Sequence, residues 1–161
     1  MARKISLNSA YGAIGNQYFR YYDKAIAEGI TKSGQLSIRW IENKLNKYLN
    51  NILKTDEDYV VASDTDSVYL TMDKLVSETI KSDNALSKTI NFLDKVASES
   101  IEPYITKSYE QLKQYTNAYA NKMFMKREVI ADKGIWVAKK RYILNVWDSD
   151  CLLYTSDAAD E

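Results

Sequence analysis

Apolar residues recur at steps of three and four positions between residues 32 and 54, which predicts an amphipathic helix with one buried face. That face consists of Ile38, Ile41, Leu45, Tyr48, Leu49 and Ile52. A shorter helical pattern covers residues 3–14, and the glycines at and after its end weaken and stop it. Residues 86–119 are helical again, with a boundary near Pro103, since proline suits the first turn of a helix.

Short runs of β-forming residues lie between the second and third of these helices. Residues 59–62 and 68–71 read as strands, and the turn-forming residues 63–66 separate them. This order predicts a hairpin with acidic side chains at its tip.

The pattern becomes β again from residue 122 onward. One run lies within residues 123–130 and another within residues 136–144. Between them, Asp132-Lys133-Gly134 is typical of a hairpin turn. Helices that flank antiparallel strands predict an α+β fold, with helices packed on an antiparallel sheet.

The composition fits one folded domain and excludes several classes of protein. The chain has 161 residues, of which 45% are hydrophobic and 27% charged. No apolar run approaches the roughly 18 residues of a membrane span, and the N-terminal residues lack the apolar stretch of a secretory signal. The single cysteine, Cys151, excludes an internal disulfide. Because there is no histidine, a metal ion would be held by carboxylates, which select hard ions such as Mg²⁺.

Charge is balanced overall but separated along the sequence. Lys and Arg number 22, and so do Asp and Glu. Residues 1–54 and 122–142 are strongly basic, whereas residues 55–121 and 143–161 are strongly acidic. Two basic segments around an acidic one suit a protein that grips phosphate and also holds metal ions. The alternative is charge drift along a soluble chain.

Asp64 and Asp66 stand two positions apart directly after an apolar strand. Carboxylates this close repel each other unless a cation neutralises them, and a pair of magnesium ions with phosphate would do so. The alternative is an ordinary polar hairpin tip.

The first helix places Lys4, Asn8 and Tyr11 on one face, at positions i, i+4 and i+7. A cation, an amide and a flat ring together suit a nucleotide, although an ordinary mixed surface face has the same pattern. Near the C-terminus, Lys139, Lys140 and Arg141 precede Tyr142. On a strand, alternate residues of this run would share a face, and three cations suit a nucleic-acid backbone. A solvated edge strand protected by lysines is the alternative.

These three motifs together resemble family B DNA polymerases. Residues 4–12 resemble the family's K-x-x-x-N-S-x-Y-G motif, residues 64–67 resemble the end of its Y-G-D-T-D-S motif, and residues 139–142 resemble its K-K-R-Y motif. Their order and approximate separation also agree. The sequence between them resembles the replicative polymerases of T-even-type phages, over about residues 3–150.

The resemblance implies a division of the chain and a role for each motif. Residues 1–16 would be the end of the fingers helix, residues 17–150 the palm, and residues 151–161 a non-native tail. In the first motif, Lys4 would contact the triphosphate, while Asn8, Tyr11 and Gly12 would line the pocket of the nascent base pair.

The other two motifs and two acids would serve the chemistry and the primer. The resemblance implies that Asp66 bridges two Mg²⁺ ions and that Asp64 supports it as a second catalytic acid. Residues Lys139, Lys140, Arg141 and Tyr142 would contact the primer. Glu128 and Asp148 would be supporting acids in the palm.

The activity implied is template-directed DNA polymerisation, in which a primer 3′-hydroxyl attacks the α-phosphate of a deoxynucleoside triphosphate. Partners would be primer-template DNA, the triphosphate, the remainder of the polymerase chain and, through regions outside this sequence, a sliding clamp. No membrane partner is implied, and the protein would act inside the cell, in the host cytoplasm if a phage encodes it. The chain on its own would be incomplete and inactive.

Departures from the family pattern and rival functions give further expectations. Ser63 and Ala62 replace the family's glycine and tyrosine, and Lys126 replaces an aspartate, so we expect Ser63 to perturb the turn. A haloacid-dehalogenase-like phosphatase also carries a D-x-D-x-V motif after a strand, but it requires a parallel sheet with alternating helices. A non-catalytic DNA-binding module is the third alternative.

Overall fold

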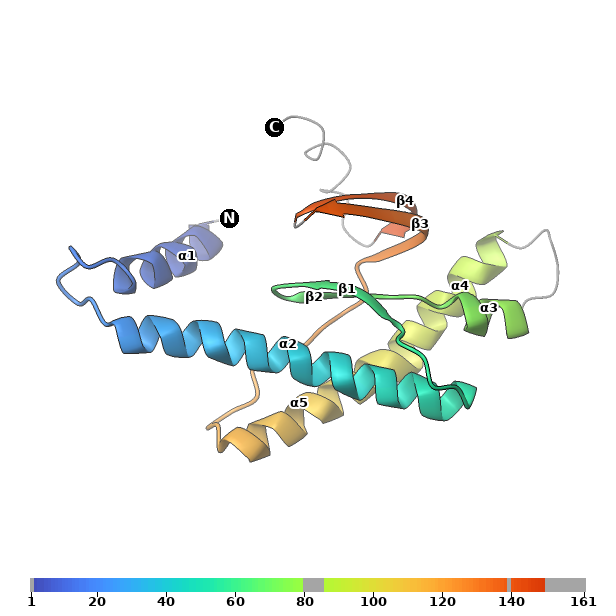
Figure 1. Ribbon diagram of the computed structural model, residues 1–161, viewed down its shortest axis with the longest axis horizontal. Coiled ribbons are helices and arrows are strands. Elements are labelled where there is room, and N and C mark those ends of the chain that lie inside the picture. The colour runs from blue at the N-terminus through green and yellow to red at the C-terminus, as the bar shows by residue number, and fades with distance from the viewer. Residues whose placement is uncertain (1, 80–85, 139, 150–161) are drawn as a thin grey trace.

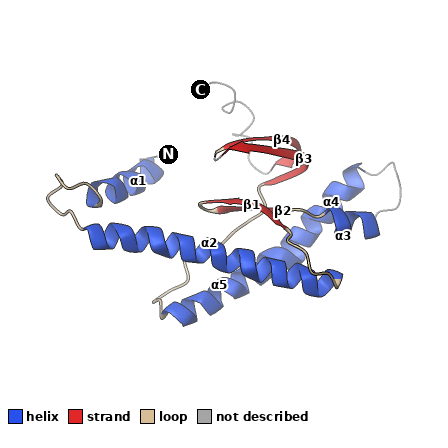
Figure 2. Cartoon of the chain, in the orientation of Figure 1, coloured by secondary structure: helices blue, strands red, loops and turns tan. Residues whose placement is uncertain are grey.

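The computed structural model describes residues 2–79, 86–138 and 140–149. Its elements are α1 (Ala2–Ile14), α2 (Lys24–Leu53), β1 (Val60–Asp64), β2 (Ser67–Leu70), α3 (Asp73–Thr79), α4 (Leu86–Val96), the π-helical segment η1 (Ala97–Ile101), α5 (Glu102–Thr116), β3 (Val129–Ala138) and β4 (Arg141–Ser149). The strands form two separate antiparallel hairpins among the helices, so the predicted α+β class is confirmed (Figure 2).

The core lies where α2 crosses α5 (Figure 1). Ile41 and Leu45 of α2 are fully buried there, and the predicted apolar face of α2 is confirmed at its centre. The facing side chains of η1 and α5 are Ile101, Ile105, Tyr109 and Leu112. The Trp40 indole N–H donates to the Ser108 carbonyl at 3.0 Å, which fixes the crossing with a polar contact.

Helix α2 begins eight residues earlier than the periodicity predicted. Its N-terminus is capped by Asp23, whose carboxylate accepts a hydrogen bond from the Ile26 amide at 3.1 Å. The early turns carry exposed apolar residues and two glycines, so they show no buried stripe from which a pattern could be read. The far end also departs from expectation, since Ile52 is exposed.

The third helical region is one continuous helical segment that consists of α4, η1 and α5. Pro103 lies in the first turn of α5, as predicted, but the preceding residues continue as η1. Helix α5 ends at Thr116, and the cap residue Asn117 adopts a left-handed conformation with φ of 52°.

Hairpin β1–β2 lies between the helical core and hairpin β3–β4 (Figure 1). Val68 and Leu70 pack against the core, whereas Tyr69 lies on the opposite face of β2. The pairing is antiparallel, with Ser63 opposite Val68 and Asp64 opposite Ser67. This topology contradicts the phosphatase alternative, whose strand would continue into a parallel sheet.

Hairpin β3–β4 corrects two sequence predictions. The expected turn at residues 132–134 lies inside β3, where Gly134 pairs with Leu144, and β3 is followed by β4 through a turn that includes Lys140, since Ala138 pairs with Arg141. Glycine is required there for space, because a Cβ on Gly134 would lie 2.6 Å from the Trp136 ring. Residues 123–125 form no strand; their segment crosses the core, where Met123 contacts Ser37. Within the described ranges, no helix combines the length and apolar character needed to cross a membrane.

Candidate active site

The acidic turn consists of Asp64, Thr65 and Asp66, between β1 and β2. Asp64 is half-buried, and the Thr65 hydroxyl donates to its carboxylate at 3.0 Å. The Ser67 hydroxyl donates to the Asp64 backbone carbonyl at 3.1 Å, and the Asp66 amide donates to the same carbonyl. Asp64 is therefore held in one orientation, while Asp66 is exposed at the end of the turn.

Backbone strain in this turn lies at Thr65. Its φ is 47°, in the left-handed region that β-branched residues rarely adopt. Ser63 has no positive φ and pairs regularly with Val68, so the perturbation expected from Ser63 does not occur. Such strain is stored where surrounding contacts enforce a conformation, and here the enforced conformation sets the direction of both carboxylates.

The two carboxylates fit part of a magnesium ligand set. Both supply only oxygen ligands, and one is exposed, as a hard cation that keeps several waters requires. Among the described residues, no group of three or more His, Cys, Asp or Glu side chains could hold a metal ion. The described residues thus supply two acidic ligands, which is compatible with other ligands coming from a substrate phosphate or from another segment.

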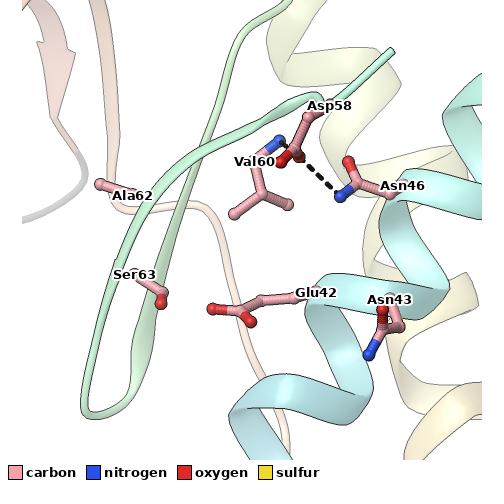
Figure 3. A pocket seen from close by; sticks show the side chains of 7 residues that line it. All are labelled: Glu42, Asn43, Asn46, Asp58, Val60, Ala62 and Ser63. Carbon is pink, nitrogen blue, oxygen red and sulfur yellow. Dashed lines mark hydrogen bonds between the residues drawn. The ribbon is translucent and has the colours of Figure 1, made fainter. Parts of the chain in front are cut away.

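A polar pocket of about 290 Å³ lies between α2 and hairpin β1–β2 (Figure 3). Its lining comprises Glu42, Asn43, Asn46, Asp58, Val60, Ala62 and Ser63. The Asn46 amide donates to Asp58 at 2.7 Å and its oxygen accepts from the Tyr59 amide, so these groups attach the hairpin to α2. Ser63 projects into the pocket (Figure 3), whereas Asp64 pairs with Ser67, on the hairpin face opposite to Val68, and is not among the lining residues. The pocket is therefore separate from the acidic turn.

The first motif lies on α1, and the predicted helix is confirmed. Asn8, Tyr11 and Gly12 are all exposed, and a Cβ at Gly12 would meet nothing within 4 Å. The Tyr11 hydroxyl shares a hydrogen bond of 2.8 Å with the Thr31 hydroxyl, which attaches α1 to α2. The side chain of Lys4 lies outside the described part of the structure.

The described part of the third motif, residues 140–142, covers a turn residue and the start of β4. Lys139 lies outside the described residues, Lys140 has φ of 63° in the turn, and Arg141 begins β4 with its side chain exposed. The strand alternation expected for this run does not apply, because Lys140 is not on a strand. Tyr142 is partly covered, and its ring lies against Tyr69 of the acidic hairpin, with ring centres 5.5 Å apart.

Arg127 is the residue that sequence reasoning missed. Its guanidinium is largely buried and contacts Asp94 at 2.8 Å and Asp148 at 2.9 Å, while its backbone amide donates to Glu102. Asp148, expected to be a supporting acid, therefore holds β4 to the helices, and Glu128 is exposed. A lone arginine beside a β pattern gives no sequence signal, because its partners come from distant segments.

The three motifs lie on one side of the molecule. The turns of both hairpins point toward the end of the structure that carries α1 (Figure 1). The acidic turn and the turn of hairpin β3–β4 therefore lie toward the same end of the structure as α1 (Figure 1).

The chain is similar in sequence to known DNA polymerases. The chain is 43% identical to the DNA-directed DNA polymerase of Escherichia phage RB69, over 94% of this chain and 18% of that protein. It is also 43% identical to the DNA-directed DNA polymerase of Enterobacteria phage T4, over 92% of this chain and 18% of that protein. A DNA polymerase of Choristoneura biennis entomopoxvirus is 24% identical over 92% of the chain.

No protein-family model matches the chain. It spans less than one fifth of the length of the phage polymerases that it matches. The resemblance predicted from the three motifs is confirmed: the chain is a counterpart of one segment of the family B DNA polymerases of T-even-type phages.

Proposed function

We propose that this chain forms the end of the fingers helix, residues 1–16, and the palm, residues 17–150, of a template-directed DNA polymerase. The observation that carries the proposal is the acidic turn: Asp64 and Asp66 lie at a hairpin tip within a segment that is 43% identical to phage DNA polymerases. The reaction is attack of a primer 3′-hydroxyl on the α-phosphate of a deoxynucleoside triphosphate, with release of pyrophosphate.

Asp64 and Asp66 are the residues proposed to hold two Mg²⁺ ions. Bound there, the ions would activate the 3′-hydroxyl and stabilise the charge of the leaving pyrophosphate. The contribution of the chain is orientation: Thr65 donates to the Asp64 carboxylate and Ser67 to the Asp64 backbone carbonyl, so this carboxylate would need little reorganisation when its partners arrive.

The nucleotide is proposed to lie along α1. The exposed side chains of Asn8 and Tyr11 face solvent and would line the base-pair pocket, with Gly12 leaving room for close approach. Lys4 is one turn earlier on the same helix and would contact the triphosphate.

The primer is proposed to bind at the basic turn, residues 139–142. Lys140 and Arg141 are exposed beside the acidic hairpin, where cations would neutralise backbone phosphates. The further partners proposed are the remainder of the polymerase and a sliding clamp that binds outside this segment. A phage enzyme of this kind would act in the host cytoplasm.

The decisive experiment replaces Asp66 in a full-length polymerase that carries this segment. Asp66→Ala should lower single-turnover nucleotide incorporation by about 1,000-fold, since it removes charge stabilisation specific to the transition state. Affinity for primer-template should stay within about twofold, because backbone contacts hold the DNA.

The matched control is Asp56→Ala, at an exposed aspartate in the loop before β1. This variant should incorporate nucleotides at the normal rate. Near-normal incorporation by Asp66→Ala would refute the assignment of the catalytic acids.

The isolated chain is proposed to be inactive, because two acids on one turn supply only part of the ligand set for two ions. Purified chain should bind DNA weakly and lose that binding as salt rises. A primer-extension assay beside an Asp66→Ala chain measures this, and extension that depends on Asp66 would show that the chain is self-sufficient.

A further inference from the structure

Three aromatic rings join the two hairpins. Tyr69 of β2 lies edge-on to Trp136 of β3 and to Tyr142 of β4, with ring centres 5.4 Å and 5.5 Å away. Trp136 and Tyr142 are cross-strand partners and stack on each other at 6.4 Å. One ring of hairpin β1–β2 therefore lies against two rings of hairpin β3–β4. We call Tyr69, Trp136 and Tyr142 together the aromatic clasp.

Polar side chains continue from the clasp to the acidic turn. The Tyr69 hydroxyl is near enough to Tyr142 and Ser67 for both to act on its pKa. Ser67 in turn donates to the Asp64 carbonyl at 3.1 Å. Burial, and then the neighbouring Tyr142, raise the pKa of the Tyr69 hydroxyl above its usual value.

The sequence of β3 makes room for the clasp. A Cβ on Gly134 would lie 2.6 Å from Trp136 Cη2 and 2.8 Å from Leu144 Cδ2. The indole therefore lies over a position where any side chain would displace it, and the glycine is explained by this approach rather than by a turn.

The other attachment of hairpin β3–β4 is remote from its turn. Arg127 binds Asp148, which pairs with Ile130 at the end of the hairpin farthest from residues 139–140. Tyr142 follows the turn by two residues. The rings of the clasp are thus placed to control where the basic turn lies relative to the acidic turn.

We propose that Tyr69, Trp136 and Tyr142 are positioning residues that set the acidic turn relative to the basic turn. This inference rests on the function proposed above. A polymerase must bring the primer terminus to its catalytic acids with sub-ångström accuracy, and displacement by about 1 Å can cost about 100-fold in rate. The clasp supplies that accuracy through ring contacts between the two hairpins, and Tyr69 and Trp136 do so without any proposed contact to nucleotide or metal.

The test uses a full-length polymerase that carries this segment, with three variants. Tyr69→Leu removes the ring, Tyr69→Phe removes only the hydroxyl, and Gly134→Ala displaces the indole. Tyr119→Leu is the control, because this tyrosine is fully exposed. The measurements are single-turnover rate, the nucleotide and Mg²⁺ concentrations at half-maximal rate, primer-template affinity and melting temperature.

We expect Tyr69→Leu and Gly134→Ala to lower the single-turnover rate by about tenfold or more and to raise the Mg²⁺ requirement severalfold. Primer-template affinity should change by less than about twofold. The single-turnover rate of Tyr69→Phe should lie between the rates of these variants and the wild-type rate. The rate of Tyr119→Leu should equal the wild-type rate. If Tyr69→Leu does not fold, Tyr69→Phe and Gly134→Ala decide the question.

A second readout is independent of activity. Spin labels at Val61 and Ile143, both exposed, report the distance between the hairpins in a Cys151→Ser background. The distance distribution should broaden in Tyr69→Leu and stay narrow in Tyr119→Leu.

Unchanged distances and kinetics in the folded clasp variants would overturn the positioning role, while Asp66→Ala remained inactive. An active Asp66→Ala would instead refute the proposed function, so the two failures are distinguishable.

Discussion

The two hairpins carry charges of opposite sign at their turns and are held in different ways. Hairpin β1–β2 lies directly on the helical core, where Val68 and Leu70 pack. Hairpin β3–β4 has most of its side chains exposed and is attached through Arg127 at one end and Trp136 and Tyr142 near the other. Packing against the core therefore sets the position of the turn with Asp64 and Asp66. A few ring and ion-pair contacts set the position of the turn with Lys140 and Arg141. The position of the basic turn therefore depends on fewer contacts than the position of the acidic turn.

The largest expected effect is loss of the core under the acidic hairpin. Leu45→Ala should lower the free energy of unfolding of the chain by about 3 kcal/mol, because a buried cavity replaces the side chain. Denaturant unfolding measures this. Ile135→Ala, at an exposed position of β3, should change the same quantity by less than about 0.5 kcal/mol. Equal effects would mean that both hairpins are equally buried.

Arg127→Ala should come next, since it removes the contacts that hold the base of hairpin β3–β4. We expect the free energy of unfolding to fall by about 2 kcal/mol, because Asp94 and Asp148 lose the largely buried cation that joins them, while solvent partly screens both carboxylates. Lys126→Ala, at the exposed neighbouring cation, is the control and should be near neutral. A neutral Arg127→Ala would show that this hairpin does not depend on its ion pairs.

Gly134→Ala should lower the free energy of unfolding by about 1–2 kcal/mol, because the new methyl group collides with the Trp136 ring. The same substitution at Gly29 should have the opposite effect on the free energy of unfolding. At Gly29 a Cβ meets nothing within 4 Å in a helix, so stability should rise by about 0.5–1 kcal/mol. Thermal unfolding of both variants compares them, and a tolerated Gly134→Ala would argue against a fixed indole.

The smallest effect concerns alkaline pH. The pKa of Tyr69 is raised above its usual value of 10.0 by burial and by Tyr142, so the folded chain holds this proton more tightly than the unfolded chain. The stabilisation is complete below about pH 10 and is lost as pH rises above it. Tyr69→Phe should therefore lose stability less steeply above pH 10 than the wild type, whereas Tyr119→Phe should follow the wild type. Parallel curves for Tyr69→Phe and wild type would contradict the linkage.

Sequence patterns predicted what depends on local spacing and missed what depends on distant partners. The buried face of α2 at Ile41 and Leu45 and the acids at a hairpin tip were predictable, because helix period and turn chemistry are local. Gly134 was misread as a turn residue. A glycine is needed at this position because the Trp136 ring lies over it, and only the folded strand brings the two residues together. The role of Arg127 was not predictable, since its partner Asp94 is 33 residues away.

The π-helical segment η1 takes up one residue more per turn than the α-helices on either side of it. An α-helix rotates by about 100° per residue, so an extra residue in regular α-helix would turn one part of the helix relative to the other by that angle. The wider turn of η1 absorbs the extra residue, and α4 keeps the face on which Asp94 meets Arg127. Deleting one residue of η1 should therefore restore α-helical geometry and preserve this contact, whereas deleting one residue within the regular turns of α5 should rotate its two halves relative to each other by about 100°.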